Sequence, residues 1–201
     1  MNILAHAYLS NRHTELLIGN FIGDFIKGDP SSFRHHLTPG VVAGVRLHRA
    51  IDSFTDAHPN VAAVRDILHP RCHKYAGAAV DIFFDHFLAV NFQALTGEPL
   101  TDFVSYFYQT LTGNRALLPS APARMADYMI RQDWLTNYQF TEGIDRSLKG
   151  VASRTAYPSG LDTAIEDFTA YYDQIAMHFK YFWPALVEHC NETRASLLAS
   201  L

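Results

Sequence analysis

Apolar residues recur at three- and four-residue spacing along most of this chain, and almost no stretch alternates with the period of two that half-buried strands require. One such stretch opens at Thr14, continues through Phe21 and Phe25, and ends before Gly28. This pattern predicts an all-α fold. Hydrophobic residues make up 48% of the 201 residues, which is enough for a sizeable core, so we expect a multi-helix bundle in one domain, 1–201.

Helix start and stop signals divide the chain into segments. Thr38 is a helix N-cap residue, Pro39 suits the first helical position, and Pro59 begins the next helix. The last helix contains Pro184, where we expect a kink. We place loops near the functional site at 28–38 and 155–161. The expected helices are 2–10, 14–27, 39–56, 59–69, 74–95, 100–112, 120–132, 141–154 and 162–198.

Charge and composition exclude several classes of protein. The formal net charge is −4, which argues against general nucleic-acid binding because such proteins usually carry a basic excess. No apolar run approaches the ~18 residues of a membrane span, and the first residues do not resemble a signal peptide. Cys72 and Cys190 show neither zinc-site nor disulfide spacing, so we interpret them as reduced thiols of a cytoplasmic protein.

Acids and imidazoles share helix faces at two places in the first third of the chain. Asn20 and Asp24 are four residues apart, beside an apolar face, although a solvated Asp on an amphipathic helix would look the same. His48, Asp52 and Asp56 fall at i, i+4 and i+8 and form one polar stripe. Imidazole nitrogen and carboxylate oxygen suit a divalent ion, while an exposed helix with one His–Asp pair is the alternative.

A third group lies on a helix that is apolar nearly all round and is therefore expected to be central. Asp81 and Asp85 are four residues apart, and His86 follows directly. Two carboxylates on a central helix need a compensating charge, which is either a metal or a buried cation such as an arginine. His6 is a weaker candidate, because a lone histidine is more often structural than a ligand.

No glycine-rich phosphate loop and no nucleophile elbow occurs in the sequence, and neither cysteine has the context of a nucleophile. The chemistry that these residues leave open is metal-assisted hydrolysis.

At these residues the chain resembles the acyl carrier protein phosphodiesterases. The resemblance runs nearly end to end, with several motifs in order: M-N-I-L-A-H at 1–6, G-N-F-I-G-D-F at 19–25, V-V-A-G-V-R-L-H-R-A-I-D at 41–52, T-D at 55–56, D-I-F-F-D-H-F-L at 81–88 and G-V-A-S-R at 150–154. It implies an all-helical fold likened to the HD-type metal phosphohydrolases with a permuted motif order, and a role beside fatty acid biosynthesis. It implies Mn²⁺, with Mg²⁺ or another divalent ion as alternatives. The ligand candidates that it implies are Asp24, His48, Asp85 and His86, with His6 and Asp81 as further candidates.

The resemblance also implies the substrate, holo-acyl carrier protein, from which the family removes 4′-phosphopantetheine. We expect Mn²⁺ between Asp24, His48 and the Asp85–His86 helix, with Arg49 on a phosphate oxygen. Asp52 would orient a ligand or the attacking water, and Asp56 or Asp81 would support a cation. Substrate-binding candidates are Lys27, Ser153 and Arg154. An acidic carrier further requires a basic face, for which the candidates are Lys27, Arg34, Arg46, Arg146, Lys149 and Arg154.

Two other functions stay open at this point. The first is an HD-like hydrolase that acts on a nucleotide or another small phosphoester. The second is a helical interaction protein whose polar clusters are buried ion pairs.

Overall fold

The computed structural model describes all residues, 1–201, and is helical throughout, which confirms the all-α prediction. Its elements are α1 (Ile3–Leu9), α2 (Thr14–Ile22), η1 (Gly23–Phe25), η2 (Phe33–His35), α3 (Pro39–Ala57), α4 (Pro59–Cys72), η3 (His73–Tyr75), α5 (Ala76–Val90), α6 (Phe92–Thr96), α7 (Leu100–Gly113), η4 (Arg115–Leu117), α8 (Ser120–Arg131), α9 (Trp134–Asn137), α10 (Thr141–Ala152), η5 (Leu161–Thr163), α11 (Ile165–Ala170) and α12 (Tyr172–Ala199).

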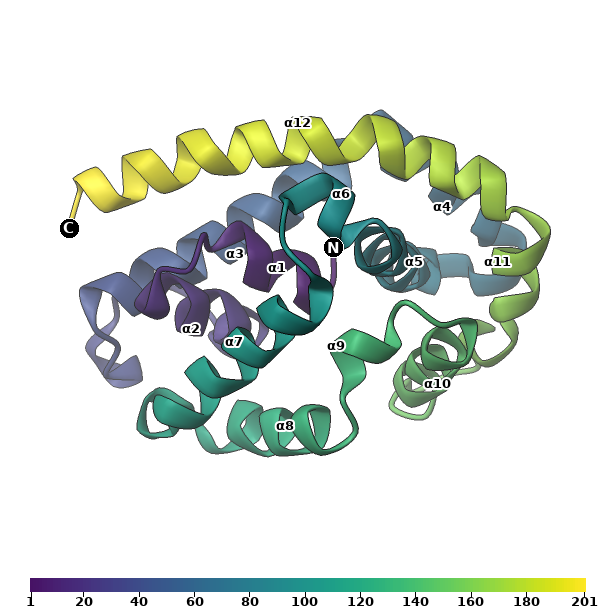
Figure 1. Ribbon diagram of the computed structural model, residues 1–201. Helices are drawn as coiled ribbons and strands as arrows, with labels where there is room; N and C mark the ends of the chain where they lie inside the picture. Colours follow the sequence, from purple (N-terminus) through teal and green to yellow (C-terminus); the bar gives the residue numbers. More distant parts are fainter.

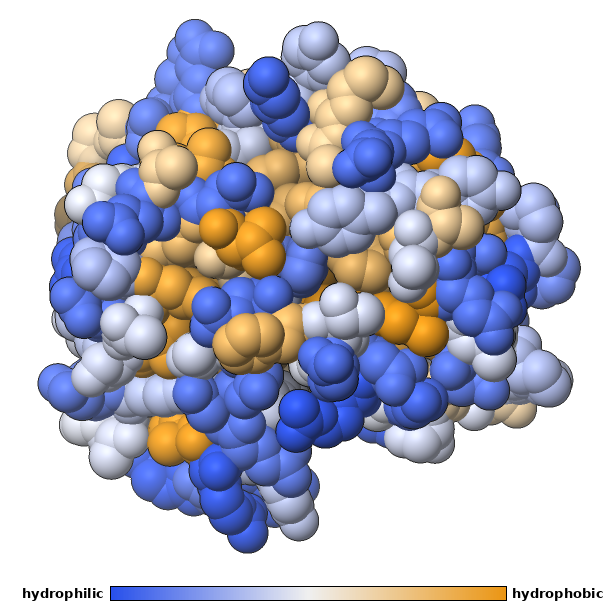
Figure 2. Space-filling view, turned by 45° about the vertical axis from the view of Figure 1, so that its right-hand side comes forward, coloured by the Kyte–Doolittle hydropathy of each residue, from blue (hydrophilic) through white to orange (hydrophobic).

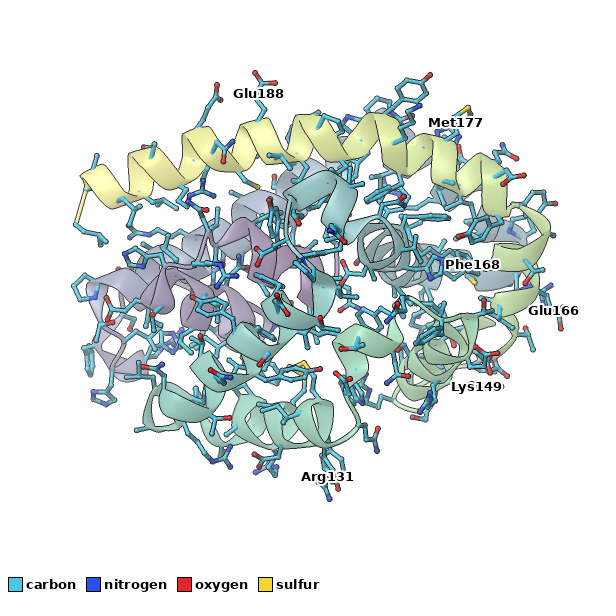
Figure 3. All side chains as sticks on the ribbon, in the orientation of Figure 1. Arg131, Lys149, Glu166, Phe168, Met177 and Glu188 are labelled. Atoms are coloured by element: carbon cyan, nitrogen blue, oxygen red, sulfur yellow. The ribbon has the colours of Figure 1, made fainter.

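Helix α5 occupies the middle of the molecule, as its apolar sequence predicts, and contacts α1, α4, α10 and α12 (Figure 1). Phe83, Phe84 and Phe87 of α5 are buried among aromatic side chains of later helices. Phe168 of α11 points into this group, with its ring 4.5 Å from that of Phe83 (Figure 3). Aromatic contacts around the central helix therefore supplement a core of mostly aliphatic side chains.

Helix α12 lies along one edge of the molecule and covers α3, α4 and α5 (Figure 1). Its outer side carries Glu188 and Met177, which point away from the core (Figure 3). On the face drawn in Figure 2, apolar side chains stand in separate small groups among hydrophilic ones. No helix combines the length and hydropathy that a membrane crossing needs.

Helices α2 and α3 approach each other most closely, and they do so through two glycines. A Cβ added to Gly19 would lie 2.1 Å from the carbonyl oxygen of Val41 and 2.7 Å from the Cα of Gly44. The contact is therefore backbone against backbone, with no side chain between the helices. Because α2 ends beside α3 in this way, the residues that follow Gly19 face those that follow Gly44.

Most expected helix boundaries agree with the structure within a few residues, and the exceptions are informative. The predicted helix 74–95 is interrupted at Asn91, whose side chain donates to the carbonyl oxygen of Phe87 at 2.8 Å. The predicted helix 162–198 is interrupted at Tyr171, while α12 continues through Pro184. Helix α2 passes into the 3-10 turn η1 at Gly23, and the short helix α9 was not expected.

Candidate metal centre

Three side chains from α1 and α3 form a compact group, which we call the His–Asp cluster: His6, His48 and Asp52. Their ligand atoms all lie within 4.8 Å of one another. The Nε2 atom of His6 is 3.2 Å from Oδ1 of Asp52, and the Nε2 atom of His48 is 3.1 Å from Oδ2. The two imidazole rings are stacked with their centroids 4.3 Å apart. One carboxylate therefore faces two imidazoles, and one polar stripe of α3 supplies two of the three groups.

Asn20 of α2 orients both histidines of the cluster. Its side-chain NH₂ donates to the carbonyl oxygen of His6 at 2.8 Å and to Oγ of Ser10 at 3.1 Å, so its Oδ1 faces Nδ1 of His6 at 2.7 Å. The backbone carbonyl oxygen of Asn20 accepts from Nδ1 of His48 at 2.9 Å. Both imidazoles therefore carry a proton on Nδ1, and in their neutral forms both direct an Nε2 lone pair toward Asp52.

Two lone pairs beside a carboxylate repel one another unless a proton or a cation lies between them. Burial opposes a charge on His48, but hydrogen bonds with Asp24 and Asp52 outweigh it and raise the pKa of His48 to about 9. Burial would raise the pKa of Asp52, yet its hydrogen bonds with His48 and His6 hold that pKa well below the usual range. Burial lowers the pKa of His6. The cluster thus attracts positive charge to its centre.

Asp24 lies at the rim of the cluster, on the 3-10 turn that follows α2. Its Oδ1 is 3.3 Å from Nε2 of His48, and its side chain is 83% exposed. The turn passes close to His48 because residue 23 is glycine: a Cβ there would lie 2.2 Å from Cγ of the imidazole. Asp24 can therefore reach the centre of the cluster from the solvent side.

The cluster opens into a cavity of about 590 Å³, a size typical of small-molecule sites. One wall comes from α1, the end of α2 with η1, α3 and α5, and the other comes from α7 to α10 and the turn after α10. The predicted site residues that line it are His6, Asp24, His48, Asp52, Asp56, Asp81 and Arg154. Asp56 also pairs with Arg65 at 3.4 Å, and Asp81 pairs with the amino group of Met1 at 2.7 Å.

Asp85 and His86 do not join the cluster, although the sequence suggested them as ligands together with His48. The buried carboxylate of Asp85 accepts the backbone N–H groups of Asn2, Leu4 and Ala5 at 3.2, 2.7 and 3.3 Å. Burial raises the pKa of Asp85 to about 7, and the positive charge that opposes this rise comes from the amino group of Met1 and from the N-terminal end of α1.

The ring of His86 faces a different side of α5. Its Nδ1 donates to the carbonyl oxygen of Tyr138 at 2.8 Å, and its Nε2 accepts from the hydroxyl of Tyr172 at 3.0 Å. Both ring nitrogens are thus used in holding α9 and α12 against α5.

Three other predicted site residues also lie outside the cavity lining. Arg49 donates to the backbone carbonyl oxygens of Ile26 and Gly28 at 2.9 and 2.7 Å, so it holds the segment after η1 in place. Lys27 is exposed, and its carbonyl oxygen accepts from Arg34 at 2.8 Å. Ser153 donates to the carbonyl oxygen of Gly150 at 2.9 Å.

The residues present fit a divalent cation. Two imidazole nitrogens and one carboxylate converge, a second carboxylate stands at the rim, and both histidines donate their other N–H to an oxygen, as metal-bound histidines generally do. Sequence reasoning did not identify the orienting role of Asn20. The motif G-N-F-I-G-D-F carried a signal, because an amide beside apolar residues has to find partners when it is buried.

Comparison with known proteins gives a consistent result. A family model described as acyl carrier protein phosphodiesterase matches residues 1–186. The chain is 31% identical over 191 residues to the acyl carrier protein phosphodiesterase of Salmonella agona, covering 93% of this chain and 96% of the relative. It is 32% identical over 195 residues to that of Escherichia coli O139:H28, covering 95% and 98%. No solved structure matches the chain.

Proposed function

Because this chain belongs to the acyl carrier protein phosphodiesterase family, we propose that it hydrolyses the phosphodiester that joins 4′-phosphopantetheine to a serine of holo-acyl carrier protein. The observation that carries the proposal is the His–Asp cluster. Two lone pairs, fixed by Asn20, and one carboxylate converge at one wall of a cavity large enough for a small-molecule group.

The cluster would hold the metal through Nε2 of His6, Nε2 of His48 and the carboxylate of Asp52. A divalent ion held there supplies a Lewis acid that neutralises the charge of the phosphodiester and makes a water more acidic. Asn20 keeps both imidazoles in the tautomer that leaves Nε2 free. Asp24, which is largely exposed beside His48, is placed to accept a proton or to complete the ligand set.

The reaction breaks the bond between phosphorus and the serine oxygen. Water supplies the oxygen that joins phosphorus, and the serine oxygen takes up a proton, so the products are apo-carrier protein and 4′-phosphopantetheine. Asp56 lines the same cavity one turn after Asp52 on α3, and it would support the charge of the site. Arg154, on the opposite wall, would contact the phosphate.

The donor set bears on which ion is used. Imidazole nitrogens disfavour Mg²⁺, which prefers oxygen ligands and keeps several waters. We therefore expect Mn²⁺ to support turnover better than Mg²⁺ after treatment with a chelator.

The deciding experiment is incubation with holo-carrier protein and Mn²⁺, with the intact mass of the carrier as readout. We expect the wild-type protein to convert the carrier to its apo form, and His48→Ala and Asp52→Asn to leave it intact. His69→Ala is the matched control, because His69 is exposed and lies outside the cavity. An intact carrier with wild-type protein, or equal turnover by all variants, would refute the proposal. Hydrolysis of nucleotides under the same conditions would favour the alternative substrate.

A further inference from the structure

Helix α10 and the turn that follows it present two arginines and a glycine to the cavity. Arg146 and Gly150 are four residues apart on α10 and share one face, Arg154 lies on the turn after Ala152, and all three line the cavity. Arg146 and Arg154 are the only arginine or lysine side chains in the lining. The remaining charged groups there, on the wall that faces α10, are mostly carboxylates. The basic side chains of the cavity are therefore concentrated on α10 and the turn that follows it.

Neither arginine is paired with a carboxylate. Lys149, on the outer side of the same helix, pairs with Asp145 at 2.6 Å (Figure 3). No carboxylate neutralises Arg146 or Arg154 in this way. Arg154 donates only through Nε, to the carbonyl oxygen of Gly150 at 3.0 Å, which leaves both terminal NH₂ groups free. Its guanidinium therefore already lies beside Gly150, ready to bind an anion.

Gly150 has no structural reason to be glycine. A Cβ added there would meet nothing within 4 Å, whereas one added to Gly143 of the same helix would lie 2.0 Å from the carbonyl oxygen of Asn137. Glycine inside a helix is less favourable than alanine by ~1 kcal/mol. Packing therefore does not explain the glycine at position 150, although glycine destabilises the helix. Its lack of a side chain leaves open space on the cavity wall between the two arginines.

We infer that the C-terminal half of α10 and the turn after it bind the phosphopantetheine arm, with the guanidiniums of Arg146 and Arg154 on the phosphate oxygens and the chain of the arm against Gly150. This inference rests on the proposed function and specifies its substrate subsite. Arg146 lies one helical turn before Gly150, and Arg154 reaches back from the following turn to the carbonyl oxygen of Gly150, so one arginine stands on each side of the glycine. A planar guanidinium can bind two phosphate oxygens at once, so two unpaired arginines suit the phosphate of a phosphoester.

The test measures binding without turnover. 4′-Phosphopantetheine is titrated calorimetrically into the full-length protein in the presence of a chelator, so that metal loading does not contribute. We expect Arg146→Gln and Arg154→Gln each to weaken binding roughly 10- to 100-fold, the range for a lost charge-assisted hydrogen bond. Gly150→Leu should weaken it comparably while leaving Tm equal or higher, because leucine favours the helix.

Gly77→Leu is the matched control. Gly77 lies in α5, a Cβ there also meets nothing within 4 Å, and it does not line the cavity. It should leave the affinity for 4′-phosphopantetheine unchanged. Unchanged affinity in all three α10 variants would overturn the inference, and so would equal affinity of the wild type for inorganic phosphate and 4′-phosphopantetheine. These binding results can be distinguished from failure of the proposed function. The calorimetric titration measures affinity for 4′-phosphopantetheine without metal, whereas the carrier assay measures turnover.

Discussion

Replacing Gly23 by alanine should disrupt the proposed metal site by adding one methyl group beside His48. The backbone at Gly23 is right-handed helical, with φ −50° and ψ −45°, so alanine is conformationally acceptable there. The added Cβ would lie 2.2, 2.5 and 2.7 Å from Cγ, Cδ2 and Cβ of His48. Ordinary contact begins near 3.4 Å, so the imidazole or the turn has to move by more than an ångström. Rotation of the imidazole cannot relieve the contact with Cβ of His48, so the turn or α3 has to shift as well.

A shift of that size affects every contact of the ring. His48 is 2.9 Å from the carbonyl oxygen of Asn20, 3.1 Å from Asp52 and 3.3 Å from Asp24, so an ångström takes these pairs out of hydrogen-bonding range. Loss of a partner that orients a metal ligand typically costs 10- to 100-fold in metal affinity. This corresponds to about 1.4–2.8 kcal/mol, and we expect Gly23→Ala to weaken Mn²⁺ binding within that range.

The assay is a Mn²⁺ titration followed by calorimetry, with Gly77→Ala as the control that adds a methyl group in open space. A double-mutant cycle shows whether the effect passes through His48. In a His48→Ala background the contacts with Cγ and Cδ2 are gone and only the 2.7 Å contact with Cβ remains, so Gly23→Ala should cause a much smaller further loss. Wild-type Mn²⁺ affinity in Gly23→Ala, or a fully additive cycle, would refute this reasoning.

Three further predictions follow from the same contacts. Asn20→Ala should lower the free energy of unfolding by about 2–4 kcal/mol, because buried groups of His6 and Ser10 lose their partner, and a urea titration measures this. Asp85→Asn should cost about 1–3 kcal/mol in the same assay, since one amide oxygen cannot accept the three N–H groups that the carboxylate accepts, and an unchanged midpoint would contradict that role. Arg49→Met should speed hydrogen exchange in residues 26–28 while leaving Mn²⁺ affinity unchanged, and a loss of kcat without faster exchange would return Arg49 to the substrate role that its sequence position suggested.

The helices could be predicted where local chemistry defines their ends. The side chain of Thr38 accepts the backbone N–H of Val41, and Pro39 occupies the first turn. These two adjacent residues therefore predict the start of α3. The interruption at Asn91 could not be predicted in this way, because it depends on a side chain turning back to the preceding helical turn. Helix α9 has only four residues and is too short for a periodic pattern.

For the candidate site, the sequence was informative where the spacing is local. His48 and Asp52 are four residues apart on one helix, and both lie in the cluster. His6 comes from another helix, and only the packing of α1 against α2 places it there. Asp85 and His86 were considered together because they are adjacent, yet consecutive residues on a helix point ~100° apart. One side chain therefore meets α1 and the other meets α9 and α12. Asp85 accepts backbone N–H groups, which nearly every residue type carries, so the sequence could not identify these partners.

The capping of α1 by Asp85 has a consequence for the order of folding. Helix α1 has seven residues, too few to be stable alone, and the carboxylate that binds its first N–H groups lies about eighty residues later in the chain. During synthesis α1 therefore has to wait until the middle of the chain has left the ribosome, and His6 reaches its position late. A truncated nascent chain that ends before α5 would carry His48 and Asp52 without an ordered third partner. Metal affinity should therefore appear only in nascent chains that include α5, and its appearance would report that α1 has packed against the central helix.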